Sequence, residues 1–356
     1  MAPQFVWCAL NERCHLTPAK LRARIVFPLL AFFVATVVLA TASAAPGSSS
    51  ELRPEIEQLY NSGRYRQAAE ALEALLKESP QDASSHYWLG RCFYELHDYN
   101  RASSSLELAV MYTPDRSEYH DWLGKALGRR AEETSPFSPF SGFSLARKTH
   151  HEFETAVRLD AGNFEAQRDL IRFLFSAPGI VGGGDEHALE QIRALTAVDP
   201  IEGRLAQAEY FASRKKFDQA VDEYQKVIGE QPKRIGVFFE VAEYYRDRGD
   251  GEGMNRVVEA GSKLAPFDPR LGYYRGVAWA LMKKDLGAAE ANLRTYLAAV
   301  PDSSEAPPHV SGHEWLARVY EEEGKTDQAV EEYRAVLTLD PHDKIARDAL
   351  KRLEKL

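Results

Sequence analysis

Cysteine is nearly absent from this chain, which excludes two common ways of stabilising a fold. There are three cysteines in 356 residues. Cys8 and Cys14 precede an apolar segment, and only Cys92 lies in the remainder. A single cysteine cannot form an internal disulfide bond, and no pair of cysteines has the spacing of a zinc site. The folded part must therefore be held together by packing.

An excess of positive charge is also missing. The chain has 44 lysines and arginines against 53 aspartates and glutamates, which gives a formal net charge of −9. Residues 1–45 carry +3, so the remainder carries −12. Binding to nucleic acid needs cations that replace the counterions of phosphate, and an acidic chain argues against it. The hydrophobic content of 44% is that of a folded protein.

Motifs of common catalytic and cofactor sites are missing too. There is no G-x-S-x-G nucleophile elbow, and His313-Glu314 is not completed to H-E-x-x-H. Glycines within 179–184 could cradle phosphate before a helix, but Asp185 and Glu186 follow where a phosphate loop has lysine and a hydroxyl residue. A structural linker with Asp185 as helix N-cap is the simpler interpretation. We expect no catalytic residues, no cofactor and no enzyme activity.

Two histidines have the spacing of a metal site. His309 and His313 are four residues apart, so a helix would place both on one face. Pro307 and Pro308 directly precede them, which favours a loop at His309, and no third ligand follows nearby. Metal binding is the alternative interpretation, and we predict no metal site.

Residues 1–45 have the pattern of an export signal. Three basic residues within 20–24 precede an apolar run over 25–40, and the small residues Ala42-Ser43-Ala44 follow. This order is typical of a secretory signal peptide. The alternative is an uncleaved anchor, because the run to Ala45 is about 21 residues long and could span a bilayer. In both cases the rest of the chain is exported. A cleaved chain would be periplasmic or secreted, and an uncleaved one would be anchored to the inner membrane with its repeats outside the cytoplasm.

The rest of the chain repeats itself with a period near 34 residues. The clearest copy has Trp88 and Gly90 in one helical stretch. Ala102 and Leu106 share one face of a second stretch, and Gly90 leaves room for this helix to approach. The same frame recurs eight times, and the longer steps mark insertions. The closing positions of the copies are Pro80, Pro114, Ala161, Pro200, Pro232, Pro266, Pro301 and Pro341.

This pattern resembles the tetratricopeptide repeat, W-x2-L-G-x2-Y, then A-x3-F, then P. It is also similar to a group of exported bacterial tetratricopeptide proteins of unassigned function. The resemblance implies an all-α fold, a right-handed α-solenoid of about eight helix pairs with a concave groove. A final helix should cap the stacking face of the last repeat. The expected parts are a signal or anchor (1–45), a linker (46–50), the solenoid (51–341, with insertions near 131–145, 177–184 and 302–308) and the capping helix (342–356).

The first of these insertions is rich in phenylalanine. It contains Phe137, Phe140 and Phe143 among proline, serine and glycine. Three phenylalanines in a loop need burial or a partner. They either pack on the solenoid or form a loop that binds a partner or touches a membrane.

In this family the first helix of each pair lines the groove, and charges recur there. Arg91, Lys125 and Arg172 occupy matching positions, followed by Glu209 and Glu243. A cationic half would favour an acidic peptide or carboxylate. The alternative is that these charges pair with neighbouring acids such as Asp121. The asparagines of the family's carboxylate clamp are missing, so that role is not expected. The predicted groove residues are Tyr87, Arg91, Tyr94, Lys125, Arg129, Arg168, Arg172, Phe239 and Tyr273.

These observations predict a non-catalytic scaffold or adaptor for protein–protein interaction. It would bind a peptide or helix of an unidentified protein partner in the groove, and no nucleic acid. Only the N-terminal segment, if uncleaved, would contact a membrane. One alternative is a self-associating assembly factor of the envelope, acting through the phenylalanine-rich insertion. Another is an accessory subunit of an envelope enzyme.

Overall fold

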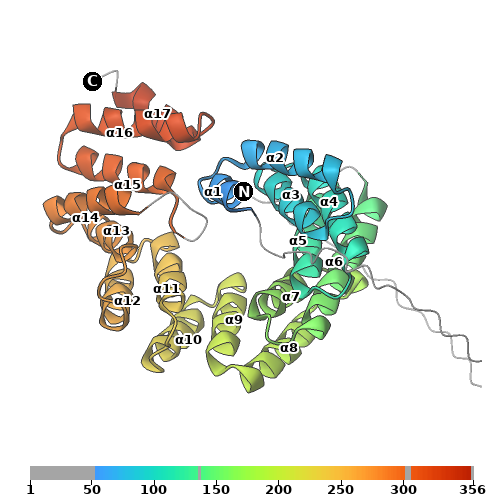
Figure 1. Ribbon diagram of the computed structural model, residues 1–356. Helices are drawn as coiled ribbons and strands as arrows, with labels where there is room; N and C mark the ends of the chain where they lie inside the picture. The colour runs from blue at the N-terminus through green and yellow to red at the C-terminus, as the bar shows by residue number, and fades with distance from the viewer. Residues whose placement is uncertain (1–52, 135–137, 301–305, 354–356) are drawn as a thin grey trace, which may run out of the picture. The chain divides into compact units, whose positions relative to one another are not determined.

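The described part of the chain is built from helices alone. The computed structural model describes residues 53–134, 138–300 and 306–353. It has seventeen α-helices and one short 3-10 helix over these ranges, and no strand within them (Figure 1). No helix in these ranges is both long enough and apolar enough to cross a membrane. The all-α prediction is confirmed, while the predicted export signal, the linker and Phe137 lie outside the described residues.

The helices form eight consecutive pairs, followed by one last helix. The first helices of the pairs are α1 (Pro54–Asn61), α3 (Ala83–Glu95), α5 (Ser117–Thr134), α7 (Phe164–Ser176), α9 (Pro200–Ser213), α11 (Ile235–Asp247), α13 (Leu271–Met282) and α15 (His309–Glu322). The second helices are α2 (Tyr65–Glu78), α4 (Tyr99–Tyr112), α6 (Pro139–Leu159), α8 (Asp185–Val198), α10 (Phe217–Gly229), α12 (Gly251–Leu264), α14 (Leu286–Ala299) and α16 (Thr326–Leu339). The eight pairs are the eight predicted repeats.

Apart from α10 and α11, each helix packs closely on the next one along the chain, which makes the fold a solenoid. First helices also contact one another across successive pairs: α3 with α5, α5 with α7, α7 with α9, α11 with α13, and α13 with α15. We call the surface that these helices form the first-helix face. The last helix, α17 (Lys344–Leu353), packs on α16 and buries Leu350 and Leu353. It covers the end of the stack, as expected of a cap.

Close contact within a pair depends on small residues. A Cβ atom added at Gly90 would lie 2.5 Å from Cγ of Leu106, and one at Gly276 would lie 2.7 Å from Cγ of Leu293. Leu106 and Leu293 are fully buried. Glycine at these positions therefore lets α3 approach α4 and α13 approach α14, as the sequence predicted for Gly90.

Successive pairs are also joined by a recurring hydrogen bond. In α3 and α5, Nε2 of His86 and of His120 lies 2.8 Å and 2.9 Å from a proline carbonyl six residues earlier. In α7, Gln167 donates to the carbonyl of Ala161 at 2.5 Å. Carbonyl oxygens only accept, so the histidine Nε2 atoms must carry hydrogen. The same polar position thus ties the start of each of these repeats to the closing residue of the previous one.

The insertion near 131–145 contributes residues 131–134 to α5 and residues 139–145 to α6, so these residues are helical and do not form the loop expected there. It lengthens both helices of the third pair, so that α5 has 18 residues and α6 has 21, against 13 and 14 in the preceding pair. Phe140 and Phe143 lie near the start of α6. Phe143 is half-buried, whereas 88% of Phe140 is exposed.

The insertion near 177–184 also differs from its prediction. Gly179–Val181 forms a 3-10 helix, and Gly184, with φ of 137°, is the N-cap of α8. Asp185 is the first helical residue and not the cap. Its carboxylate binds Arg214 and accepts from the hydroxyl of Tyr210, so α9 holds it instead of the α8 backbone.

Candidate partner-binding surface

Arg91 of α3 is surrounded by aromatic rings. Its guanidinium carbon lies 4.2 Å from the ring centre of Trp88 and 4.4 Å from that of Trp122. Tyr60 and Tyr87 follow at 4.8 Å and 5.5 Å. We call these four rings the aromatic box. A cation over a ring face gains about 0.5–2 kcal/mol, depending on desolvation. The box therefore holds Arg91 against the fold.

Tyr94 and Arg129 lie next to the aromatic box. The Tyr94 ring meets Trp122 edge-on, with ring centres 5.5 Å apart. Arg129 of α5 is half-exposed and pairs with Glu132 at 2.6 Å. Of these two predicted groove residues, Arg129 has the more accessible side chain.

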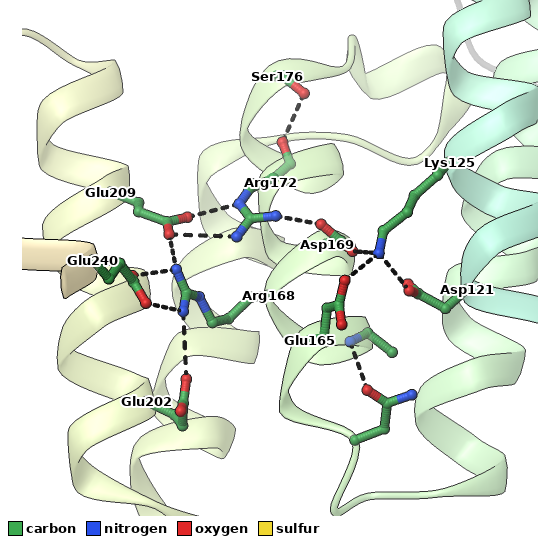
Figure 2. A network of polar contacts seen from close by, with 12 residues as sticks. Asp121, Lys125, Glu165, Arg168, Asp169, Arg172, Ser176, Glu202, Glu209 and Glu240 are labelled. Carbon is green, nitrogen blue, oxygen red and sulfur yellow. Dashed lines mark hydrogen bonds and ion pairs between the residues drawn. The ribbon is translucent and has the colours of Figure 1, made fainter. Parts of the chain in front are cut away.

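Lys125 of α5 is enclosed by three carboxylates. Its Nζ atom lies 2.8 Å from Asp121, 2.5 Å from Glu165 and 3.0 Å from Asp169 (Figure 2). Only 15% of the Lys125 side chain is exposed. Asp121 shares α5 with the lysine, while the other two come from α7. The alternative reading of the sequence, in which Lys125 pairs with Asp121, describes this arrangement.

Two arginines of α7 continue these contacts toward α9 and α11 (Figure 2). Arg168 donates to Glu240 at 2.8 Å, contacts Glu209 and lies 3.6 Å from Glu202. Arg172 pairs with Glu209 at 2.9 Å and also with Asp169. We call the whole set the carboxylate network: Asp121, Lys125, Glu165, Arg168, Asp169, Arg172, Glu202, Glu209 and Glu240.

The basic side chains of the carboxylate network do not neutralise all of its carboxylates equally. Burial and the nearby charge of Asp169 raise the pKa of Asp121, although Lys125 acts in the opposite direction. Burial likewise raises the pKa of Glu240, with Arg168 opposing it. For Glu209, burial acts to raise the pKa, but Arg168 and Arg172 outweigh it and the pKa is lowered. Asp121 and Glu240 would therefore gain from a further positive charge.

A cavity of about 380 Å³ opens beside the network. This volume is within the range of small ligand pockets. Its walls come from α7, α9 and α11, three successive first helices, and from the residue that precedes α11. That residue, Arg234, binds Glu202 at 2.7 Å and brings a further cation to the rim. The lining residues are Phe164, Glu165, Arg168, Arg172, Glu202, Arg234, Gly236, Val237 and Glu240.

Three predicted groove residues lie in the core instead. Tyr273 is fully buried and packs on Tyr296, with ring centres 5.4 Å apart. Phe239 stacks on Tyr274 at 4.5 Å, and Tyr87 stacks on Tyr119 at 4.6 Å. The prediction that these three side chains lie on the groove surface is therefore wrong. Burying an aromatic ring between helices stabilises the folded state more than leaving it exposed on the first-helix face.

The candidate metal ligands have partners within the protein. In the described part of the chain, carboxylate oxygens of Asp121, Glu165 and Asp169 lie within 4.8 Å of one another, a spacing that suits a cation. The Lys125 ammonium binds all three. His309 begins α15 and is not in a loop; its Nε2 atom is 2.7 Å from the carbonyl of Val300. His313 lies 2.6 Å from Glu332.

Sequence reasoning missed the carboxylates that complete the network. Glu165, Asp169, Glu202 and Glu240 were not singled out, and neither was Arg234. A signal was present in the spacing, because Glu165 lies four residues before Asp169 and thus on the same face of one helix. The pairing of Arg168 with Glu240, 72 residues away, depends on how the helices stack.

Comparisons with known proteins agree with this fold. Two family models described as tetratricopeptide repeat match residues 59–126 and 311–343. Yeast Tom70 has a similar structure, with 15% sequence identity over 89% of this chain and 66% of its own, and a TM-score of 0.58. A tetratricopeptide repeat protein of Parabacteroides merdae has 14% identity over 80% of this chain and 99% of its own, with a TM-score of 0.43. No curated protein sequence matches this chain. The likeness to Tom70 is one of fold.

Proposed function

Since this chain is a tetratricopeptide repeat protein, we propose that it is a non-catalytic scaffold whose first-helix face binds a segment of a partner protein. The observation that carries the proposal is the cavity of about 380 Å³ bounded by α7, α9 and α11. Ligand sites are concave and combine apolar walls with a few convergent polar groups. Phe164 and Val237 supply apolar wall here, and the carboxylate network supplies the polar groups.

The cavity is reachable from solvent. Arg172 and Arg234 are exposed, and 66% of the Glu165 side chain is open to solvent. Gly236 is exposed and has no heavy atom within 4 Å of the place where a Cβ would lie. A partner segment can therefore approach the rim without rearranging helices.

The charged groups of the cavity support binding rather than catalysis. Each arginine in its wall pairs with at least one carboxylate, on α7, α9 or α11. Such pairs fix the shape of the walls, and a preformed surface lowers the entropic cost of binding. A scaffold needs this rigidity more than it needs a titrating group.

Site-specific photocrosslinking tests the proposal. A photoreactive amino acid at Gly236, the second residue of α11, should crosslink a partner in cells. The matched control is Gly287, the second residue of α14, which is also exposed and has no heavy atom within 4 Å of an added Cβ. We expect a specific adduct from Gly236 and none from Gly287. Equal adducts from both positions, or none from Gly236, would reject the first-helix face as the binding surface.

Self-association is the second candidate, and the exposure of Phe140 favours it. Phe140 is 88% exposed at the start of α6, so its ring is accessible for packing against a second copy of the chain. If the insertion joins copies of the chain, Phe140→Ser should lower the mass seen by light scattering. An unchanged mass would remove this candidate.

We also propose that the protein is exported. The support is the order of basic, apolar and small residues within 1–45, which is typical of a signal peptide. N-terminal sequencing of the protein from its native cell tests the cleavage near Ala44. A mature chain that begins at or near Ala45 is the expected result, and a cytoplasmic chain with an intact N-terminus would contradict it.

A further inference from the structure

We infer that the segment bound in the cavity between α7, α9 and α11 is cationic, so that lysine or arginine side chains of the partner enter it. This inference deepens the proposed function and rests on it. It reverses the preference for an acidic peptide that the pattern of arginines and lysine in the sequence indicated.

The first argument is the balance of charge. The carboxylate network holds three basic side chains, and Arg234 adds a fourth. Six carboxylates face them, so the network and Arg234 together have an excess of two carboxylates: Asp121, Glu165, Asp169, Glu202, Glu209 and Glu240. The charged residues that line the cavity balance, three to three, and the excess comes from residues of the network outside the lining. Potentials that complement each other steer association and exclude partners of the wrong charge. The region therefore attracts a cation.

The second argument is the count of free acceptors. A carboxylate offers about four acceptor positions, whereas an arginine has five donors and a lysine three. Arg168 and Arg172 already direct their terminal nitrogens at Glu209, Glu240 and Asp169. One oxygen of Glu165 binds Lys125, and most of this side chain remains exposed. An incoming ammonium or guanidinium thus meets free oxygens at Glu165, whereas an incoming carboxylate competes at Arg168 and Arg172 with carboxylates that are already bound.

The third argument is the shape of the cavity. The long stems of lysine and arginine pack along apolar surface while their charged ends reach polar groups. Phe164 and Val237 form such a surface on the wall. Glu165 on α7 and Glu240 on α11, with 66% and 32% of their side chains exposed, are the accessible carboxylates of the cavity wall. Basic side chains of a bound segment can therefore lie along the wall and reach these carboxylates.

The test uses two fluorescently labelled short peptides on the whole protein. One alternates lysine with alanine and leucine, and the other has glutamate in place of every lysine. Anisotropy should show binding of the lysine peptide only, and binding that weakens as salt is added. The double variant Glu165→Gln and Glu240→Gln should weaken it about tenfold, the effect of one close charge pair.

The matched control is the double variant Glu70→Gln and Glu73→Gln. Both glutamates are exposed on α2, so the net charge changes equally. We expect less than a twofold effect, which is below the size of one close charge pair. Circular dichroism should show that both variants are folded. Equal loss in both would assign the effect to bulk charge and overturn the inference, as would binding of the glutamate peptide. If Gly236 crosslinks a partner while the lysine peptide fails to bind, only the cationic class is rejected and the proposed function stands.

Discussion

Arg91 and Arg172 occupy the same position of the repeat, the ninth residue of α3 and of α7, yet the side chains in contact with them differ in kind. Ring faces of Tyr60, Trp88 and Trp122 lie around Arg91. Carboxylates lie around Arg172, which pairs with Asp169 and Glu209. The repeat frame sets where a side chain stands, and the adjacent helices decide what it can do there.

The difference separates a packed region from a binding region. Aromatic rings attract a cation without adding charge, so the aromatic box is already filled by its own arginine. Carboxylates attract cations at long range, and six of them around four basic groups leave a negative excess beside a cavity. Only the carboxylate network can therefore select a partner by its charge.

The largest expected effect comes from removing the central cation of the network. Arg168→Met should lower the free energy of unfolding by about 3–5 kcal/mol. The three carboxylates Glu202, Glu209 and Glu240 would lose the positive charge of the arginine at a place that water solvates poorly. The Glu202 side chain is only 5% exposed. Urea denaturation followed by circular dichroism measures this loss.

The control for this variant is an exposed ion pair. Lys284→Met breaks a pair with Glu252 in which both side chains are about two thirds exposed. A surface pair contributes at most about 1 kcal/mol, so this change should be nearly silent. Equal effects of the two variants would show that the network behaves as ordinary surface charge, and the comparison between the regions would lose its basis.

In the aromatic region, apolar packing should matter more than charge. Leu106 is fully buried against Gly90, so Leu106→Ala should cost about 2–5 kcal/mol through lost contacts and a cavity. Unfolding in urea at low and high salt should give the same loss, since no charge changes. A cost under about 1 kcal/mol would contradict the placement of Leu106 between α3 and α4.

Removing the cation of the aromatic box should have a smaller effect. Arg91→Met keeps an unbranched side chain among the rings of Trp88 and Trp122 and leaves no carboxylate of a network unpaired. We expect a loss of about 1–2 kcal/mol, the scale of desolvated cation–π contacts. Thermal unfolding of the two methionine variants side by side gives the ranking. If Arg91→Met cost as much as Arg168→Met, the distinction between the two regions would fail.

The sequence predicted the repeat frame but not the pairing across it. Eight helix pairs and a final helix follow from apolar spacing and from closing residues such as Pro80 and Pro114, because these are local signals. The excess of carboxylates beside α7 could not be predicted from such local signals. It depends on Glu240 meeting Arg168 from two repeats later, and on the side that each helix turns toward its neighbours.

The same limit explains the errors at single residues. Tyr273 and Phe239 share a helical frame with groove positions, and a small rotation of the helix decides between surface and core. The insertion near 131–145 is rich in proline and serine, yet Pro139 fits the first turn of α6, where a missing N–H costs nothing. Phe140 is thereby carried to an exposed helix start.

The smallest expected effect concerns pH and compares equivalent histidines. Burial acts to lower the pKa of His120, but its contact with Glu152 and the carbonyl of Pro114 outweigh this, so the pKa is raised. A raised folded-state pKa stabilises fully below the unfolded value of about 6.5, and this contribution is lost as pH rises through the folded value. Stability should therefore fall as pH rises above about 6.5.

His120→Gln should remove this fall, because glutamine does not titrate yet can keep the hydrogen bond to the carbonyl. The chain itself supports the choice, since Gln167 makes the same bond in the next repeat. His86→Gln is the control: Nε2 of His86 binds the Pro80 carbonyl, and its Nδ1 atom has no hydrogen-bond partner in the described structure. Thermal unfolding between pH 6 and 8, the range about the histidine pKa, should thus be flattened by the first variant alone. A slope that survives His120→Gln would place the titrating group elsewhere, and one that His86→Gln also removes would tie it to the shared carbonyl bond instead of to Glu152.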